Sequence, residues 1–134
     1  TMRDGLNTLT PAVDKAVSAF IEDIYQRGMS DDVLLVMTGE FGRTPRINKN
    51  GGRDHWGNLC PLVFVGGGLK MGQVIGQSDP HGGEPISDPV SSQQVLATIM
   101  NTLFDTGMLR LQQGIPREIE ETMTGGDPIS QLFS

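Results

Sequence analysis

The chain has 134 residues, an ordinary apolar fraction of 37% and a net charge of −6. This length suffices for one domain with a core, and the acidity argues against nucleic acid as a partner. No apolar run approaches the roughly 20 residues of a membrane-spanning helix, and the single cysteine, Cys60, excludes an internal disulfide and a cysteine-based zinc cluster. Because it lies beside a proline and before an apolar run, we interpret Cys60 as a buried, inert thiol.

In chain order, the first predicted element is an amphipathic helix over residues 10–28. Thr10 suits the N-cap, Pro11 suits the first helical position, and Gly28 suits the end of the helix. Apolar residues recur at helical spacing on one face, and charged residues occupy the opposite face. The apolar face consists of Val13, Ala16, Val17, Phe20, Ile21 and Ile24. This pattern predicts a helix that covers a core.

Two apolar runs without alternation predict strands over residues 33–38 and 62–66. Such runs are typical of strands buried on both faces. Between them lies the loop GEFGRTPRINKNGGRDHWGN, residues 39–58. Long loops inside compact domains are uncommon and are usually functional or disordered. Because ligands of open α/β sheets bind outside the carboxyl ends of the strands, the position of this loop indicates a site.

The later elements are shorter. The stretches GGGLKMG and DPHGG, the second of which contains His81, are typical of turns. QVIGQ, residues 73–77, predicts a short edge strand. A helix is predicted over residues 91–105, with Ser91 as N-cap and a capping box to the glutamine three residues on. IPREIEETMTGG predicts a short polar helix, and DPISQLFS a docking tail. The order helix, strand, loop, strand, helix predicts an α/β fold.

The loop contains three groups that could hold a metal. Glu40 follows the first strand and could be a metal ligand, a general base, or a surface charge paired with Arg43. Asp54 and His55 are adjacent, so their side chains diverge on an extended backbone, although a curled loop would let both bind metal. Carboxylate oxygen together with imidazole nitrogen suits zinc, manganese or iron better than calcium. The alternative for His55 is a structural hydrogen-bonding role.

Arg43, Arg46 and Arg53 make a local excess of positive charge in an acidic chain. The planar guanidinium suits bidentate binding of phosphate, sulfate or carboxylate. Alternatively, these arginines pair with Glu40 and Asp54 and hold the loop in shape. The chain contains no nucleophile elbow and no HExxH helix, and no Ser-His-Asp arrangement can be assigned. The residues by themselves therefore leave the chemistry open.

Four stretches carry a resemblance to a known family. They are GEFGRTPRINKNGGRDHWGN, VFVGGGLKMGQVIGQSD, DPVSSQQVLATIMNTLF and GGDPISQLF. They resemble the C-terminal half of a bacterial family known as domain of unknown function 1501. That family is similar to the alkaline-phosphatase-like superfamily, which includes phosphatases, sulfatases and phosphomutases. The resemblance implies a central sheet flanked by helices, with divalent metals such as zinc bound where loops leave the strands.

By position, the resemblance implies that Glu40 and His55 bind metal and that Asp54 is a further ligand or orients His55. Arg43 or Arg53 would neutralise charge on the phosphate or sulfate group of a small-molecule or carbohydrate ester. The residue after Glu40 is a phenylalanine, so the histidine that the superfamily has in this place is absent.

The nucleophile of the superfamily and its other acidic ligands also have no counterpart in this chain. We therefore expect residues 1–134 to form a single domain that is a fragment of a longer one, and an isolated half-sheet would favour homo-oligomers. Three hypotheses stand: a metal-dependent ester hydrolase, a homologue that keeps the fold without the chemistry, and a module that binds anions or acidic carbohydrates.

Overall fold

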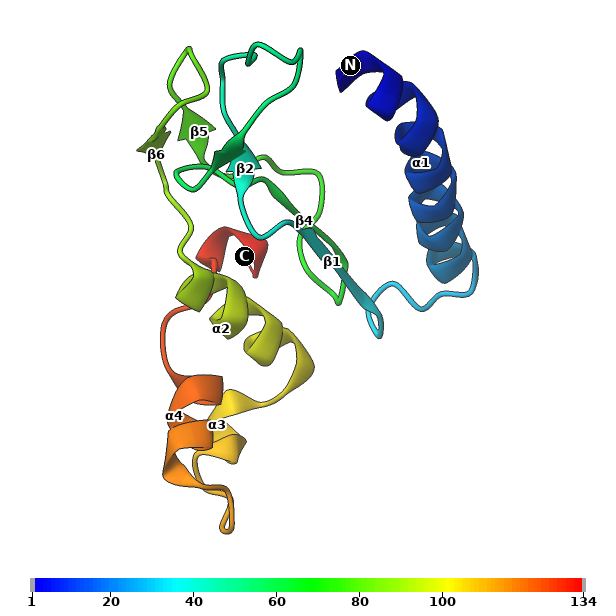
Figure 1. Ribbon diagram of the computed structural model, residues 1–134. Coiled ribbons are helices and arrows are strands. Elements are labelled where there is room, and N and C mark those ends of the chain that lie inside the picture. Colours follow the sequence, from blue (N-terminus) through cyan, green and yellow to red (C-terminus); the bar gives the residue numbers. More distant parts are fainter. Residues whose placement is uncertain (1, 134) are drawn as a thin grey trace.

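The computed structural model describes residues 2–133 (Figure 1). Its elements are α1 (Met2–Gln26), β1 (Leu34–Thr38), β2 (Gly42–Arg43), β3 (His55–Trp56), β4 (Leu62–Gly66), β5 (Gln77–Ser78), β6 (Pro85–Ser87), α2 (Ser92–Leu103), α3 (Thr106–Leu109), α4 (Arg117–Thr124) and the 3-10 helix η1 (Ser130–Leu132). The fold is mixed α/β, with a long N-terminal helix, small antiparallel two-stranded sheets and C-terminal helices. Among the described residues, no helix is long and apolar enough to cross a membrane.

The two predicted strands are confirmed as β1 and β4, which pair with each other in antiparallel register from Leu34↔Gly66 to Thr38↔Leu62. Within the described residues neither strand has a second neighbour, so the predicted extended sheet flanked by helices is not present. The prediction that both faces of these strands are buried is also wrong, since Val63 is 47% exposed. Leu34 and Phe64 pack against the core, and apart from the buried Gly66 the other residues of the ribbon are partly buried or exposed.

The core lies between this ribbon and the C-terminal tail. Its buried members are Leu69, Ile129 and Leu132, and partly buried apolar side chains surround them. The backbone N–H of Lys70 donates to the carbonyl oxygen of Leu132 at 2.8 Å. The predicted docking tail is therefore confirmed, because η1 buries its apolar residues against the turn that follows β4.

Thr98 ties this tail to α2. Its side chain is fully buried, and its Oγ1 donates to the carbonyl of Gln94 at 2.7 Å and accepts the backbone N–H of Ile129 at 2.9 Å. The predicted helix over 91–105 is confirmed as α2, with Ser91 as N-cap in a complete capping box. The short polar helix predicted after it is confirmed as α4.

The predicted helix over 10–28 is confirmed in type but begins earlier, at Met2, with Pro11 inside it. The apolar stripe continues upstream through Leu6 and Leu9, so the helix extends past Thr10 and Thr10 is not its N-cap. The helix ends at Gln26, and Gly28 follows with φ +67°.

The prediction that α1 covers a core is wrong. Its only buried residue is Ile24, while Leu9 is 68% and Val13 52% exposed. In Figure 1 the helix stands apart from the ribbon, and its first residue contacts the tip of the long loop, where the N–H of Met2 donates to the carbonyl of Gly51 at 3.2 Å.

The edge strand predicted over 73–77 is wrong for most of its length, because only Gln77 of that range lies in β5. Gly76 has φ +81°, which an extended strand does not accommodate. The turn predicted at GGGLKMG is confirmed, with three successive glycines, Gly66 to Gly68, at positive φ.

We predict that Thr98→Val lowers the free energy of unfolding by about 1–3 kcal/mol, because it leaves the buried N–H of Ile129 without a partner. Thr102→Val is the matched control, since the Thr102 hydroxyl bonds only within α2, to the carbonyl of Thr98. We expect the control to cost less than about 1 kcal/mol. Urea unfolding of both variants measures the difference, and equal losses would show that the contact with the tail contributes nothing.

Candidate functional site

The long loop between β1 and β4 is organised by a small sheet of its own. β2 pairs antiparallel with β3, with Gly42 opposite Trp56 and Arg43 opposite His55. Gly42 is buried, and a Cβ atom there would overlap the carbonyl oxygen of Leu59. Only glycine lets the outgoing and returning halves of the loop approach this closely.

One face of this ribbon is cationic. Directly opposite residues of an antiparallel pair project to the same face, so Arg43 and His55 lie together. Phe41 lies beneath them, with its ring centroid 3.9 Å from that of His55 and 6.0 Å from Cζ of Arg43. By the alternation of an extended chain, Arg53 projects to the side of His55. We call the surface formed by Arg43, Arg53 and His55 the cationic face, after its two arginines; all three residues are exposed.

The structure distinguishes between the two roles considered for the arginines. Among the described residues, the recorded ion pairs are Arg27–Asp23 and Arg117–Glu121, and neither belongs to the loop. Glu40 is exposed and forms no ion pair with Arg43. The arginines therefore do not brace the loop through its carboxylates, and their guanidinium groups are available to a ligand.

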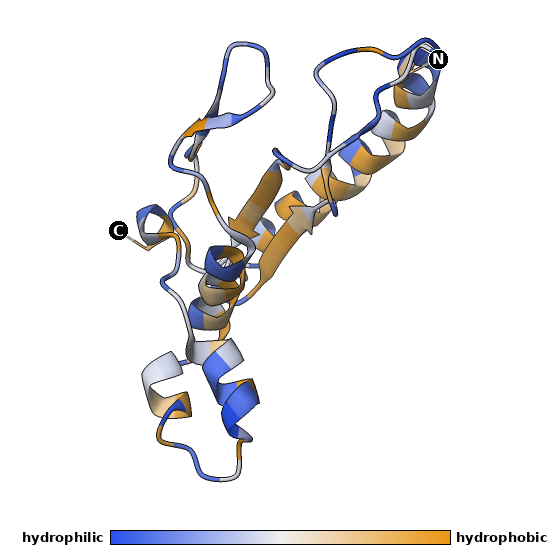
Figure 2. Cartoon of the chain, turned by 60° about the vertical axis from the view of Figure 1, so that its left-hand side comes forward, coloured by the Kyte–Doolittle hydropathy of each residue, from blue (hydrophilic) through white to orange (hydrophobic). Residues whose placement is uncertain are grey.

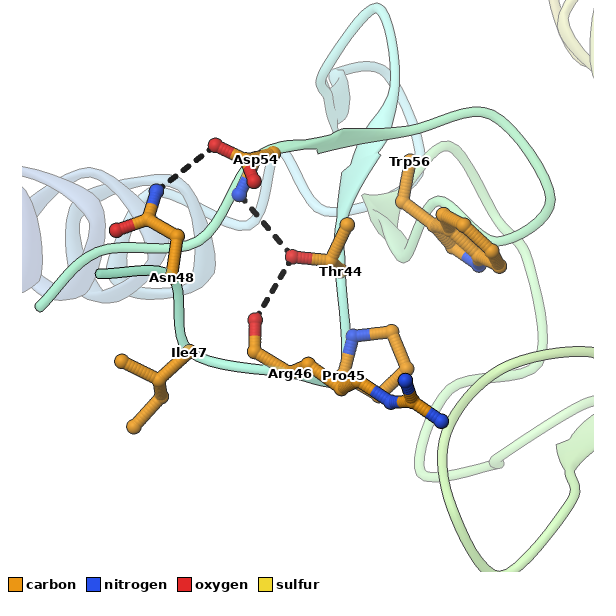
Figure 3. A pocket seen from close by; sticks show the side chains of 7 residues that line it. All are labelled: Thr44, Pro45, Arg46, Ile47, Asn48, Asp54 and Trp56. Carbon is orange, nitrogen blue, oxygen red and sulfur yellow. Dashed lines mark hydrogen bonds between the residues drawn. The ribbon is translucent and has the colours of Figure 1, made fainter. Parts of the chain in front are cut away.

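The opposite face of the ribbon carries a pocket of about 420 Å³ (Figure 3). A carboxylate oxygen of Asp54 accepts from the amide of Asn48 at 2.8 Å, and the N–H of Asp54 donates to Oγ1 of Thr44 at 3.0 Å. The Thr44 hydroxyl in turn donates to the carbonyl of Arg46 at 2.9 Å. The pocket is lined by Thr44, Pro45, Arg46, Ile47, Asn48, Asp54 and Trp56.

Two hydrogen bonds hold the loop against the β5–β6 hairpin. The indole N–H of Trp56 donates to the carbonyl of Gly83 at 2.7 Å, and the amide of Asn58 donates to the carboxylate of Glu84 at 2.5 Å. These bonds join segments more than twenty residues apart in the chain. They fix the indole ring and, through β3, the position of the neighbouring His55.

The hairpin tip is ordered by Asp79. Its carboxylate accepts the backbone N–H of Gly83 at 2.7 Å and of His81 at 3.1 Å. The hydrogen bond from Gly83 is the main cause that holds the pKa of Asp79 below its ordinary value of 3.8. The turn predicted around His81 is confirmed, and Gly82 lies in it with φ +68°.

The three proposed metal ligands do not converge within this chain. Asp54 points into the pocket, whereas His55 projects from the opposite face of the same ribbon. In the part of the chain that the structure describes, no three His, Cys, Asp or Glu side chains form a group that could hold a metal ion. A metal centre with Glu40 and His55 among its ligands stays a prediction, and it needs further donors.

The prediction of a buried thiol is wrong, since Cys60 is exposed. It lies where the loop returns to β4, with Sγ 3.3 Å from the carbonyl oxygen of Gly39. β4 begins two residues later, at Leu62, so Cys60 lies outside the paired strands.

Sequence reasoning missed the residues that shape the pocket. Asn48 organises the turn at its tip, since its Oδ1 accepts the N–H groups of Asn50 and Gly52 at 3.0 Å each. The sequence NKNGG carries the signal for such a turn, because asparagine side chains bond the backbone two residues on. Thr44 has no comparable local signal, since its partner Asp54 is ten residues away.

We predict that Gly42→Ala separates β2 from the returning half of the loop and costs about 1–3 kcal/mol, because its methyl group would overlap the Leu59 carbonyl. Gly57→Ala is the control, since a Cβ there meets nothing within 4 Å. Urea unfolding, with Trp56 fluorescence as the probe, measures the effect. Two variants of equal stability would contradict the close approach.

We predict that Asp79 stabilises the folded chain only while it is ionised. Its pKa is lowered on folding, so the contribution is present above the unfolded pKa and is lost as the pH falls through the lower folded pKa. The difference in free energy of unfolding between wild type and Asp79→Asn should be full at neutral pH and vanish in strong acid. Asp14→Asn is the control. A difference that does not change with pH would refute the prediction.

Residues 1–132 match the family described as "Protein of unknown function (DUF1501)". No curated protein and no solved structure matches the chain. Because the match spans almost the whole chain, this protein belongs to the DUF1501 family.

Proposed function

We propose that the 39–58 loop binds the phosphate or sulfate group of an anionic ester, as part of a site of the phosphatase and sulfatase kind. The observation that carries this proposal is the cationic face. Arg43 lies opposite His55, and alternation of the chain before β3 places Arg53 on the same side. Both arginines are exposed and have no carboxylate partner among the described residues. In a chain of net charge −6, such a local reversal of sign favours an anionic ligand.

The chemistry of these groups suits a tetrahedral oxyanion. Each guanidinium presents a planar fork of donors that can bind two oxygens at once. The contact of Phe41 with the His55 ring limits the ring's freedom, and the same phenylalanine lies near Arg43. A ligand that binds here therefore meets donors whose orientation is partly set before it arrives.

The metal part of the hypothesis has less support from this chain. Glu40, Asp54 and His55 remain the proposed ligands of a divalent metal such as zinc, which would act as a Lewis acid on the ester. The donors do not fit a metal by themselves, because Asp54 is bonded to Asn48 on the other face. The proposal for this chain therefore rests on the anion, and no catalytic step is assigned.

A second candidate is a module that binds anionic esters or acidic carbohydrates without turning them over. The hydrogen bond that Asp54 accepts from Asn48 favours this candidate, because it engages a carboxylate oxygen that a metal would need. The two candidates differ in their need for metal. Binding that persists unchanged in a chelator supports the module, whereas binding that requires a divalent metal supports the hydrolase.

We predict that the full chain binds inorganic phosphate and sulfate and that Arg43→Gln or Arg53→Gln weakens this binding roughly three- to tenfold at low salt. NMR titration that follows the His55 ring measures the affinity. Arg117→Gln is the control, since it removes the same charge from an exposed arginine paired with Glu121. An equal loss in the control would mean that only net charge matters and would overturn the proposal.

A further inference from the structure

The pocket opposite the cationic face has most of its polar groups already paired. Oδ1 of Asn48 accepts two backbone N–H groups, and Oγ1 of Thr44 both accepts and donates. One carboxylate oxygen of Asp54 accepts from Asn48. The groups left for a ligand are the second carboxylate oxygen of Asp54 and the guanidinium of Arg46, neither of which has a recorded partner among the described residues.

Trp56 adds an aromatic wall with a fixed orientation. Its N–H is used by the 2.7 Å bond to Gly83, so what the indole offers a ligand is its ring face. Proline and isoleucine side chains, Pro45 and Ile47, supply the other apolar surface. Figure 3 shows Trp56 and the Arg46 guanidinium toward one end of the pocket and Asn48 toward the other.

These groups together define the chemistry of the occupant. It needs an apolar ring face for Trp56, a hydroxyl that donates to Asp54, and an anionic group for Arg46. A sugar ring that carries a sulfate, phosphate or carboxylate has all three. The volume of about 420 Å³ falls in the range of small-ligand pockets.

We propose that this pocket binds an anionic sugar residue, with Arg46 on its charged substituent, Asp54 on a ring hydroxyl and Trp56 against its apolar face. The pocket is separate from the cationic face, so this inference does not depend on Arg43 or Arg53.

A plain peptide fits this pocket less well. Apart from acidic side chains, it has no anionic group for Arg46. An aromatic anion would satisfy Arg46 and Trp56 but would leave the free oxygen of Asp54 without a donor. A ligand with hydroxyl groups next to an anionic substituent satisfies both Asp54 and Arg46.

The only tryptophan of the chain lies in this pocket, so its emission reports binding directly. The full chain is titrated with glucose 6-sulfate and glucuronate, and with glucose, inorganic sulfate and benzoate as comparison probes. We expect the two anionic sugars to shift Trp56 emission saturably, at least about tenfold more tightly than glucose or sulfate. Equal or tighter binding of benzoate, which has no hydroxyl for Asp54, or no saturable change with either sugar, overturns the inference.

Variants assign the roles. Arg46→Gln should weaken the anionic sugars about tenfold and leave glucose unchanged, whereas Asp54→Asn should weaken both. Arg117→Gln is the matched control, since it removes the same charge from an exposed arginine outside the loop, and it should leave the emission titration unchanged. If Arg117→Gln costs as much as Arg46→Gln, the effect is one of net charge and the inference fails. If the wild-type chain binds sulfate at the cationic face but binds neither anionic sugar in the pocket, the inference about the pocket is refuted and the proposed function stands.

Discussion

Antiparallel pairing of β1 with β4 is the constraint on which the rest of the loop depends. Because Thr38 lies opposite Leu62, the two ends of the intervening segment are adjacent, and the chain must leave and return at one end of the ribbon. The outgoing and returning halves can then pair as β2 and β3. They come so close that Gly42 lies against the carbonyl of Leu59, where no side chain fits. The same ribbon supplies Leu34 and Phe64 to the core, so the loop is anchored in the best-packed part of the chain.

The β2–β3 ribbon has two faces, and this separates two kinds of chemistry. Alternation places His55 and Arg43 on one side and Asp54 and Trp56 on the other. Residues adjacent in sequence therefore serve different surfaces. The carboxylate that sequence position suggests as a partner of His55 is instead committed to Asn48. An exposed cationic surface and a pocket with an aromatic wall result from a ribbon that is only two residues long on each strand.

Apolar surface is unevenly used in this fold. The tail packs well, because Thr98 satisfies the backbone of Ile129 inside the core. α1 presents most of its apolar stripe to solvent, and the β1–β4 ribbon is mostly only partly buried. Figure 2 shows the apolar residues along α1 and along the ribbon. Amphipathic spacing thus specifies which face of a helix is apolar, but it does not specify that a partner lies against it. The helical spacing of α1 and the unbroken apolar run of β1 each favour one type of secondary structure locally. This explains why both elements were predictable although their neighbours in the fold were not.

The sequence by itself determined the type and approximate limits of the long elements, the capping box at Ser91 and the turns at the glycine-rich stretches, because those signals act over a few residues. It also marked the 39–58 loop and its charged residues as the candidate site. Only the tertiary structure decided that β1 and β4 pair antiparallel, that Cys60 is exposed, and that Asp54 and His55 face opposite ways. The physical reason is that strand direction and side-chain grouping depend on hydrogen bonds such as Trp56 to Gly83, which join residues distant in the chain and leave no local pattern.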